Sequence, residues 1–153
     1  MTGQRESAET KGLRQRAIKL LARREHTRVE LARKLAPHGT SEEIDIVLNE
    51  LAGAGLQSDA RFAESYVKSR AARLGGARLR QTLRTRGVAA ELIDSQLQQA
   101  ELPDETERAR AVRARKFPLP PADVREWAKQ ARFLQARGFS SEIIRKLLKE
   151  GAT

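Results

Sequence analysis

Arginine and lysine are the residue types whose number and spacing in this sequence point to chemistry, and that chemistry is the binding of polyanions. The stretch from Arg61 to Arg86 contains eight basic residues and a single acid, Glu64. The stretch 108–116 adds five basic residues and no acid. Rows of basic side chains on a helix contact phosphates, which position a nucleic acid without reading its sequence. The pattern therefore predicts a nucleic-acid-binding surface in the middle and last thirds of the chain.

The residues that catalysis and metal binding require are scarce. The sequence has no cysteine, which excludes disulfides, thiolate metal sites and cysteine nucleophiles. Its two histidines, His26 and His38, have no partner at the spacing of metal ligands. No glycine-rich phosphate loop occurs, and Gly75-Gly76 is better interpreted as the end of a helix. We therefore expect a protein that is not an enzyme and that uses neither a metal nor another cofactor.

Composition narrows the class of protein further. The 153 residues carry a formal net charge of +10, and they are 39% hydrophobic but only 4% aromatic. This balance favours several small cores over one large core. No apolar run approaches the roughly 18 residues that cross a bilayer, and the polar N-terminal stretch lacks the apolar segment of a signal peptide. We expect a cytoplasmic protein that has no membrane contact and is a monomer.

A leucine, three further residues and a glycine occur three times, and an apolar helical pattern follows each time. The pairs are Leu35 and Gly39, Leu83 and Gly87, and Leu134 and Gly138, so the glycines lie 48 and then 51 positions apart. Repeats of this period are typical of stacked units whose cores are completed by their neighbours. The repeat predicts an extended binding surface rather than a catalytic pocket.

The helical signals around each glycine predict three helices per repeat. Thr27 and Glu30 form a capping-box pattern at the start of one helix, and no segment shows the alternation of a half-buried strand. The predicted fold is all-α, with three tandem three-helix repeats stacked into an elongated, curved solenoid. The expected organisation is a disordered N-terminus over residues 1–10, followed by repeats over 11–56, 57–102 and 103–153.

Three residues in the second repeat are expected to be structural. Arg70 falls near the centre of an apolar helical stripe that includes Phe62 and Tyr66, where an unpaired charge would cost several kcal/mol. We therefore expect Arg70 to form a buried salt bridge, with a partner among Asp59, Glu91 and Asp94. Phe62 belongs to the core, and Tyr66 and Trp127, which could stack on bases, are assigned to the core by their stripe positions.

Three helices with a glycine turn also suggest a helix-turn-helix protein that reads DNA sequence. The recognition helix would then be the third helix of a repeat. The third helices of the first two repeats, near 41–51 and 89–102, are acidic and would be repelled from a major groove. The repeats therefore favour a helix-turn-helix-like shape without base-specific recognition.

The second repeat carries a distinctive run of residues. It reads Asp59-Ala-Arg-Phe62-Ala63-x-x-Tyr66-Val67-x-x-Arg70, followed by Gly75 or Gly76, Leu79, Leu83, Gly87 and Val88. This run, with its flanks over 20–35 and 131–148, resembles the signature of the RecX family over roughly residues 13–150. The sequence departs from the family pattern in a shortened turn after Gly39 and in the proline-rich loop 117–121.

The resemblance implies a bacterial protein of tandem three-helix repeats that binds the RecA–single-stranded DNA filament. It implies inhibition of the filament's ATPase, strand-exchange and coprotease activities, with RecA and single-stranded DNA as partners and double-stranded DNA as a further one. Two alternatives stay open: a general basic DNA-binding protein without a recombinase partner, and a protein scaffold indifferent to nucleic acid. The residues expected to contact DNA or the filament are Lys68, Arg73, Arg78, Arg80, Arg84, Arg86, Arg110, Arg113 and Lys116.

Overall fold

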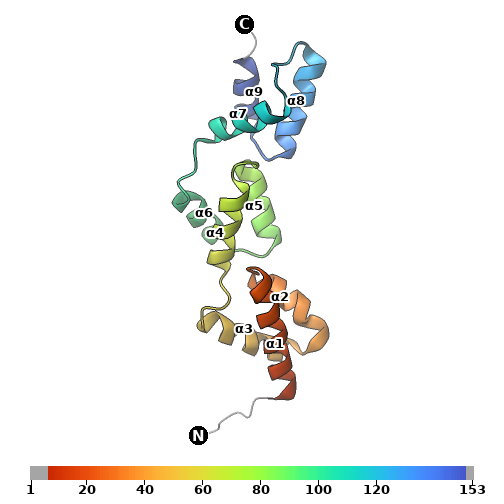
Figure 1. Cartoon of the computed structure of the whole chain (residues 1–153), viewed down its shortest axis with the longest axis vertical. Helices are drawn as coiled ribbons and strands as arrows, with labels where there is room; N and C mark the ends of the chain where they lie inside the picture. The colour runs from red at the N-terminus through yellow and green to blue at the C-terminus, as the bar shows by residue number, and fades with distance from the viewer. Residues whose placement is uncertain (1–6, 151–153) are drawn as a thin grey trace.

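The computed structural model describes residues 7–150, and within this range the chain forms nine α-helices, one 3-10 turn and no strand. The helices follow one another as three units along the long axis of the molecule (Figure 1). This confirms the predicted all-α fold of three tandem three-helix repeats. The units comprise α1 (Ala8–Arg23), α2 (Arg28–Leu35) and α3 (Ser41–Gly53); α4 (Asp59–Arg70), α5 (Gly76–Thr85) and α6 (Ala90–Gln99); and α7 (Glu105–Lys116), α8 (Val124–Ala136) and α9 (Ser141–Lys149).

The first helix begins earlier than the sequence suggested. Of the stretch 1–10 that was expected to be disordered, residues 1–6 lie outside the described part of the chain. Ser7 caps α1 by accepting a hydrogen bond from the backbone amide of Thr10, so Ala8 and its neighbours are already helical. A hydroxyl that satisfies one of the free amides at a helix start stabilises that start.

Each unit is closed by a hydrophobic core of its own. The three clusters of buried residues fall within units one, two and three respectively, and the main helix–helix contacts are also made within units. The repeat pattern had suggested that neighbouring units complete each other's cores. The structure shows instead that each core is closed within its own unit. The buried residues are Leu13, Ala17, Leu31, Leu35, Ile44, Val47, Leu48 and Leu51; Phe62, Ala63, Val67, Ala71, Leu79, Leu83, Val88 and Ile93; and Ala109, Val112, Leu134, Phe139, Ile144, Leu147 and Leu148.

The three repeat glycines do not have the same conformation. Gly87 and Gly138 have φ values of +94° and +92°, whereas Gly39 has an extended backbone with a φ of −171°. Gly87 and Gly138 each lie against the preceding unit, and a Cβ atom there would come within 2.4 Å of Val29 or 2.2 Å of Arg78. Gly39 instead faces Leu13 within its own unit.

The units are joined end to end through their second helices. The hydroxyl of Thr27, which caps α2, donates a 2.6 Å hydrogen bond to the carbonyl of Arg86 at the end of α5. The amide of Gly75, which caps α5, donates a 2.7 Å hydrogen bond to the carbonyl of Arg137 at the end of α8. The C-terminus of each second helix therefore meets the N-terminus of the one before it, and α2, α5 and α8 succeed one another along the molecule (Figure 1).

We predict that Gly138→Ala destabilises the protein. An alanine at a positive φ costs about 1–3 kcal/mol, and its Cβ would also overlap the backbone of Arg78. Urea unfolding followed by circular dichroism would measure the loss in the free energy of unfolding.

Gly12→Ala is the matched control, because Gly12 lies inside α1 with nothing within 4 Å of its added Cβ. This change should stabilise the protein by about 1 kcal/mol, since alanine favours a helix more than glycine does. An equal response of the two variants would contradict the role assigned to Gly138.

Candidate nucleic-acid interface

The nine basic residues expected to form the binding surface lie on α4, α5, α7 and the turns that follow them. Arg110 and Arg113 are half-buried and the other seven are exposed. Four of the nine are held in ion pairs, with partners on the same or a neighbouring helix. The pairs are Lys68 with Glu64, Arg80 with Asp94, Arg86 with Glu30, and Arg110 with both Glu107 and Glu150.

Four others carry charge that no acid within the described residues neutralises. Arg73, Arg78, Arg84 and Lys116 form no ion pair in this part of the chain, so their charge is available to a ligand. Arg113 differs from all of these, because its Nε and Nη1 atoms are buried without a hydrogen-bond partner among the described residues. The structure thus divides the sequence-predicted set into free cations and cations that also hold the fold.

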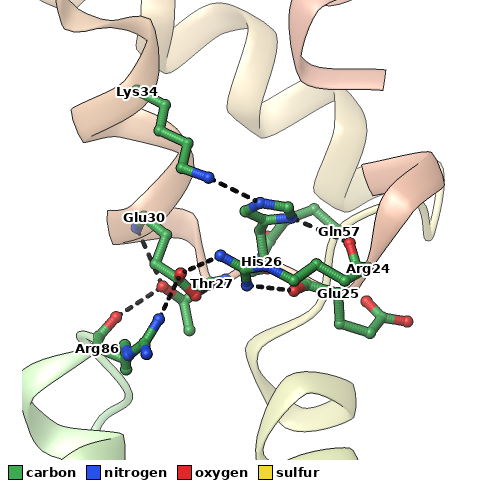
Figure 2. Close-up of polar contacts among 8 residues, drawn as sticks. All are labelled: Arg24, Glu25, His26, Thr27, Glu30, Lys34, Gln57 and Arg86. Carbon is green, nitrogen blue, oxygen red and sulfur yellow. Dashed lines mark hydrogen bonds and ion pairs between the residues drawn. The ribbon is translucent and has the colours of Figure 1, made fainter. Parts of the chain in front are cut away.

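A cluster of polar residues holds the first joint, between units one and two (Figure 2). Its centre is Glu30, only 8% exposed, which accepts 3.0 Å hydrogen bonds from Arg24 and from Arg86. Burial raises the pKa of Glu30, but the hydrogen bonds from Arg24 and Thr27, together with the charges of Arg24 and Arg86, outweigh burial, and the net pKa lies below its ordinary value. Glu30 is therefore a buried carboxylate that binds two arginines, one from each unit.

His26 lies in the same cluster and is 1% exposed. Its Nδ1 atom is 3.0 Å from the carbonyl oxygen of Arg24, and its Nε2 atom is 3.3 Å from Nζ of Lys34. A carbonyl requires a donor and an ammonium requires an acceptor, so this geometry fits a neutral imidazole that carries its proton on Nδ1. Desolvation by burial lowers the pKa of His26, and the charges of Arg24 and Lys34 act in the same direction.

The second joint, between units two and three, is held by arginines that bind backbone carbonyls. Arg108, at 9% exposure, donates from Nε to the carbonyl of Ala71 at 3.0 Å and from Nη2 to that of Leu74 at 2.8 Å. Arg115 donates to the carbonyl of Ala72 at 2.6 Å. Burial lowers the pKa of Arg108, although Glu105 and Asp104 oppose this effect. Part of the second basic stretch thus supports the joint.

The expectation of a buried salt bridge at Arg70 is wrong. Arg70 is the last residue of α4 and is exposed, because the helix ends there and does not carry its apolar stripe on to Leu74. The three acids proposed as partners do not pair with it in the described chain. Phe62 is buried as expected, and Tyr66 is half-buried, with its ring parallel to that of Phe62 at a centroid distance of 6.4 Å.

A basic depression of about 240 Å³ lies at the second joint. Four cations line it, with Val112 and Phe133 and without any acid: Arg73, Arg115, Lys116 and Arg137. The guanidinium of Arg137 lies over the ring of Phe133, with its Cζ 4.9 Å from the ring centroid. This depression therefore concentrates positive charge between two units.

A second depression, of about 340 Å³, lies at the first joint. Its charged lining consists of Arg24, Arg70 and Arg86 with one acid, Glu25, and Tyr66 also lines it. Both depressions can bind an anion through guanidinium groups, which match the geometry of phosphate oxygens.

Sequence reasoning missed Arg24, Arg115 and Arg137 as candidate binding residues. A signal for one of them was present, because Arg137 precedes Gly138 just as the predicted residue Arg86 precedes Gly87. Arg24 and Arg115 reach the depressions only through the packing of one unit against the next, which the local sequence does not encode.

None of the helices between residues 7 and 150 combines the length and apolar character needed to span a membrane. Nor does this range bring together three or more histidine or acidic side chains that could bind a metal ion.

These features define an elongated all-α repeat protein with basic depressions at the joints between its units. The matches to known families agree with this class. Models of the first, second and third three-helix domains of RecX match residues 14–51, 58–97 and 103–148, in that order. This chain belongs to the RecX family.

Individual relatives extend over nearly the whole chain. The chain is 50% identical to the regulatory protein RecX of Leptothrix cholodnii over 138 residues, covering 90% of this chain and 87% of that one. It is 46% identical to the regulatory protein RecX of Ralstonia pickettii over 140 residues, covering 89% of this chain and 86% of that one. The crystal structure of RecX from Lactobacillus salivarius has the same fold, with a TM-score of 0.76 at 21% identity, covering 94% and 97%.

We predict that stability falls on acidification because of His26. Its folded-state pKa lies below the unfolded value near 6.5, so the unfolded state binds more protons as the pH drops. The stabilisation is complete above about pH 6.5 and is lost as the pH falls towards the folded-state pKa. Urea unfolding at pH 7.5 and 5.5 would measure the loss.

His26→Gln should reduce this pH dependence, while His38→Gln, at an exposed turn, should retain it. An unchanged pH dependence in His26→Gln would refute the assignment.

We also predict that Arg108→Met destabilises the protein, because it leaves the carbonyls of Ala71 and Leu74 without a donor. Loss of a partner for buried polar groups costs about 1–3 kcal/mol. The control is Arg132→Met, which removes an exposed arginine of α8 and should change the free energy of unfolding by less than about 0.5 kcal/mol.

Proposed function

We propose that this protein is a non-enzymatic modulator of the RecA recombinase filament on single-stranded DNA. In this role it inhibits the ATPase, strand-exchange and coprotease activities of the filament. The proposal is supported by membership of a family whose relatives are named regulatory protein RecX. RecA and single-stranded DNA are the proposed partners, with double-stranded DNA as a further one, and the proposed location is the cytoplasm, where the protein acts as a monomer.

The observation that carries the proposal is the repetition of basic surface along an elongated body. A nucleoprotein filament is itself a repeating polyanionic structure, and an elongated protein with cations at successive joints can contact it at several points (Figure 1). Linked contacts raise the overall affinity well above that of any single contact. The protein would lie along the filament groove and bridge neighbouring recombinase subunits or compete with the incoming DNA strand.

A general DNA-binding protein is the second candidate, and the unpaired arginines favour it as well. Arg78 and Arg84 on α5 are exposed and have no acidic partner within the described residues. Cations of this kind bind any phosphate backbone, with an affinity that falls steeply as salt rises. The two functions differ in the partner: the filament modulator binds recombinase-coated DNA better than naked DNA, and the general DNA-binding protein does not.

We predict that the protein inhibits DNA-dependent ATP hydrolysis by a bacterial RecA at concentrations well below those that coat naked single-stranded DNA. The double variant Arg78→Ala/Arg84→Ala should need roughly tenfold more protein for the same inhibition, as expected if each exposed cation contributes about 0.7 kcal/mol. The Cβ of residue 78 that lies against Gly138 is retained in this variant. The assay is a titration of ATPase rate against protein concentration.

Arg125→Ala/Arg145→Ala provides the control, because it removes two exposed charges that lie outside the two basic stretches 61–86 and 108–116. It should inhibit like the unaltered protein. Inhibition that begins only when the DNA is saturated would reject the filament modulator in favour of the general DNA-binding protein.

A further inference from the structure

The two basic depressions occupy equivalent places in the repeat. Ala63 on α4 and Ala109 on α7 are both fully buried and correspond to one another, which places Arg70 opposite Lys116 in the comparison of the two units. Arg70 lines the first depression and Lys116 the second. Each depression therefore contains one cation that comes from the same position of the first helix, in successive units.

A second position of the repeat also supplies a cation to each depression. Arg86 and Arg137 are the C-cap residues of α5 and α8, each directly before a glycine with positive φ, and each lines the depression of its own joint. Arg24 directly follows α1 and Arg73 lies three residues beyond the end of α4, and they line the first and second depressions. Two positions of the repeat thus supply a cation at each joint, and the segment after the first helix of the preceding unit supplies a third from a position that differs between the two joints.

We propose that the two depressions are repeated phosphate sites that bind two phosphates of one single strand of nucleic acid, one structural repeat apart. This inference rests on the proposed function, because it specifies how a protein that acts on a DNA filament would contact the DNA strand. Neither depression is assigned to a ligand by family membership alone.

Two of the three arginines of the second depression are held in place before any ligand arrives. The guanidinium of Arg115 is fixed by the carbonyl of Ala72, and that of Arg137 by the ring of Phe133. Each retains unused N–H groups, because a guanidinium has five donors. Binding a phosphate to side chains already ordered costs less conformational entropy than binding one to free side chains.

The first depression is similar in position but weaker in charge. Arg24 and Arg86 are both bound to Glu30, and Glu25 also lines the site, so Arg70 is the cation there that has no acidic partner in the described chain. The second depression has four cations and no acid. We expect the second site to bind a phosphate more tightly, and the first to act when the same strand already occupies the second.

A single-stranded nucleic acid fits these sites better than an acidic protein surface. Its phosphates are spaced regularly along a flexible backbone, so one strand can reach two sites that the repeat places in succession. The ring of Tyr66 at the first depression adds a surface on which an unpaired base could stack. A protein partner would need two separate acidic groups at a matching separation.

The experiment measures binding of fluorescent oligothymidylates to the full-length protein by anisotropy at several salt concentrations, without recombinase. Each phosphate contact on a single strand contributes about 0.7 to the slope of log K against log salt. Arg70→Ala and Lys116→Ala should each reduce the slope by about 0.7 and the double variant by about 1.4. Between 50 and 200 mM salt the unaltered protein should then lose about sevenfold more affinity than the double variant loses.

The length of the strand tests whether both sites lie on one molecule of DNA. For the unaltered protein, affinity should rise steeply once the oligothymidylate is long enough to span both depressions, because the second contact becomes intramolecular. In either single variant this rise should disappear. The Arg125→Ala/Arg145→Ala control, with the same change in charge, should keep both the slope and the rise.

The other outcomes separate this inference from the proposed function. If the double variant keeps its salt slope but no longer inhibits the RecA ATPase, the depressions bind acidic groups of the recombinase, and the phosphate sites are overturned while the modulator stands. If Lys116→Ala lowers the slope and Arg70→Ala does not, the proposal that both depressions bind phosphates is overturned. A lowered slope in both variants with no ATPase inhibition by the unaltered protein supports the phosphate sites and rejects the modulator.

Discussion

The shape of this molecule depends on the hydrogen bond between the end of one second helix and the start of the second helix before it. The carbonyls at the end of a helix and the amides at its start lack partners within the helix. Here Arg86 meets Thr27, and Arg137 meets Gly75, so neighbouring helices satisfy one another. The approach also brings the negative end of one helix dipole to the positive end of the next, which is the favourable order. Close contact at Gly87 and Gly138 completes each joint.

The polar character of the joints follows from the closure of each core within its own unit. With the apolar residues already buried, the surfaces that meet between units are those of helix ends, arginines and one buried glutamate. A buried carboxylate such as Glu30 is tolerated because two guanidinium groups compensate its desolvation. Many of the basic side chains in this chain are consequently structural, and the total of 30 Lys and Arg residues overstates how many are free for a ligand.

The repeat and its helices were predictable because their signals are local. The capping box of Thr27 and Glu30 exists as the sequence pattern indicated, and the three glycine turns each lie between a second and a third helix. The joints were not predictable, because Glu30 and Arg86 are 56 residues apart and no local pattern links them. The prediction of a buried salt bridge at Arg70 was wrong for a related reason. The helical wheel assumed a helix that continues to Leu74, but the helix ends at Arg70 itself.

The joints and the basic depressions cannot be separated physically. Arg115 binds the carbonyl of Ala72 in the preceding unit, and the backbone of Arg137 binds Gly75 while its side chain lines the depression. A change in the angle between two units would therefore move these cations relative to Arg73, which belongs to the preceding unit. The same contacts that set the direction of the chain of units also set the spacing of charge within each depression. The same arginines therefore both hold the joint rigid and position a ligand in the depression.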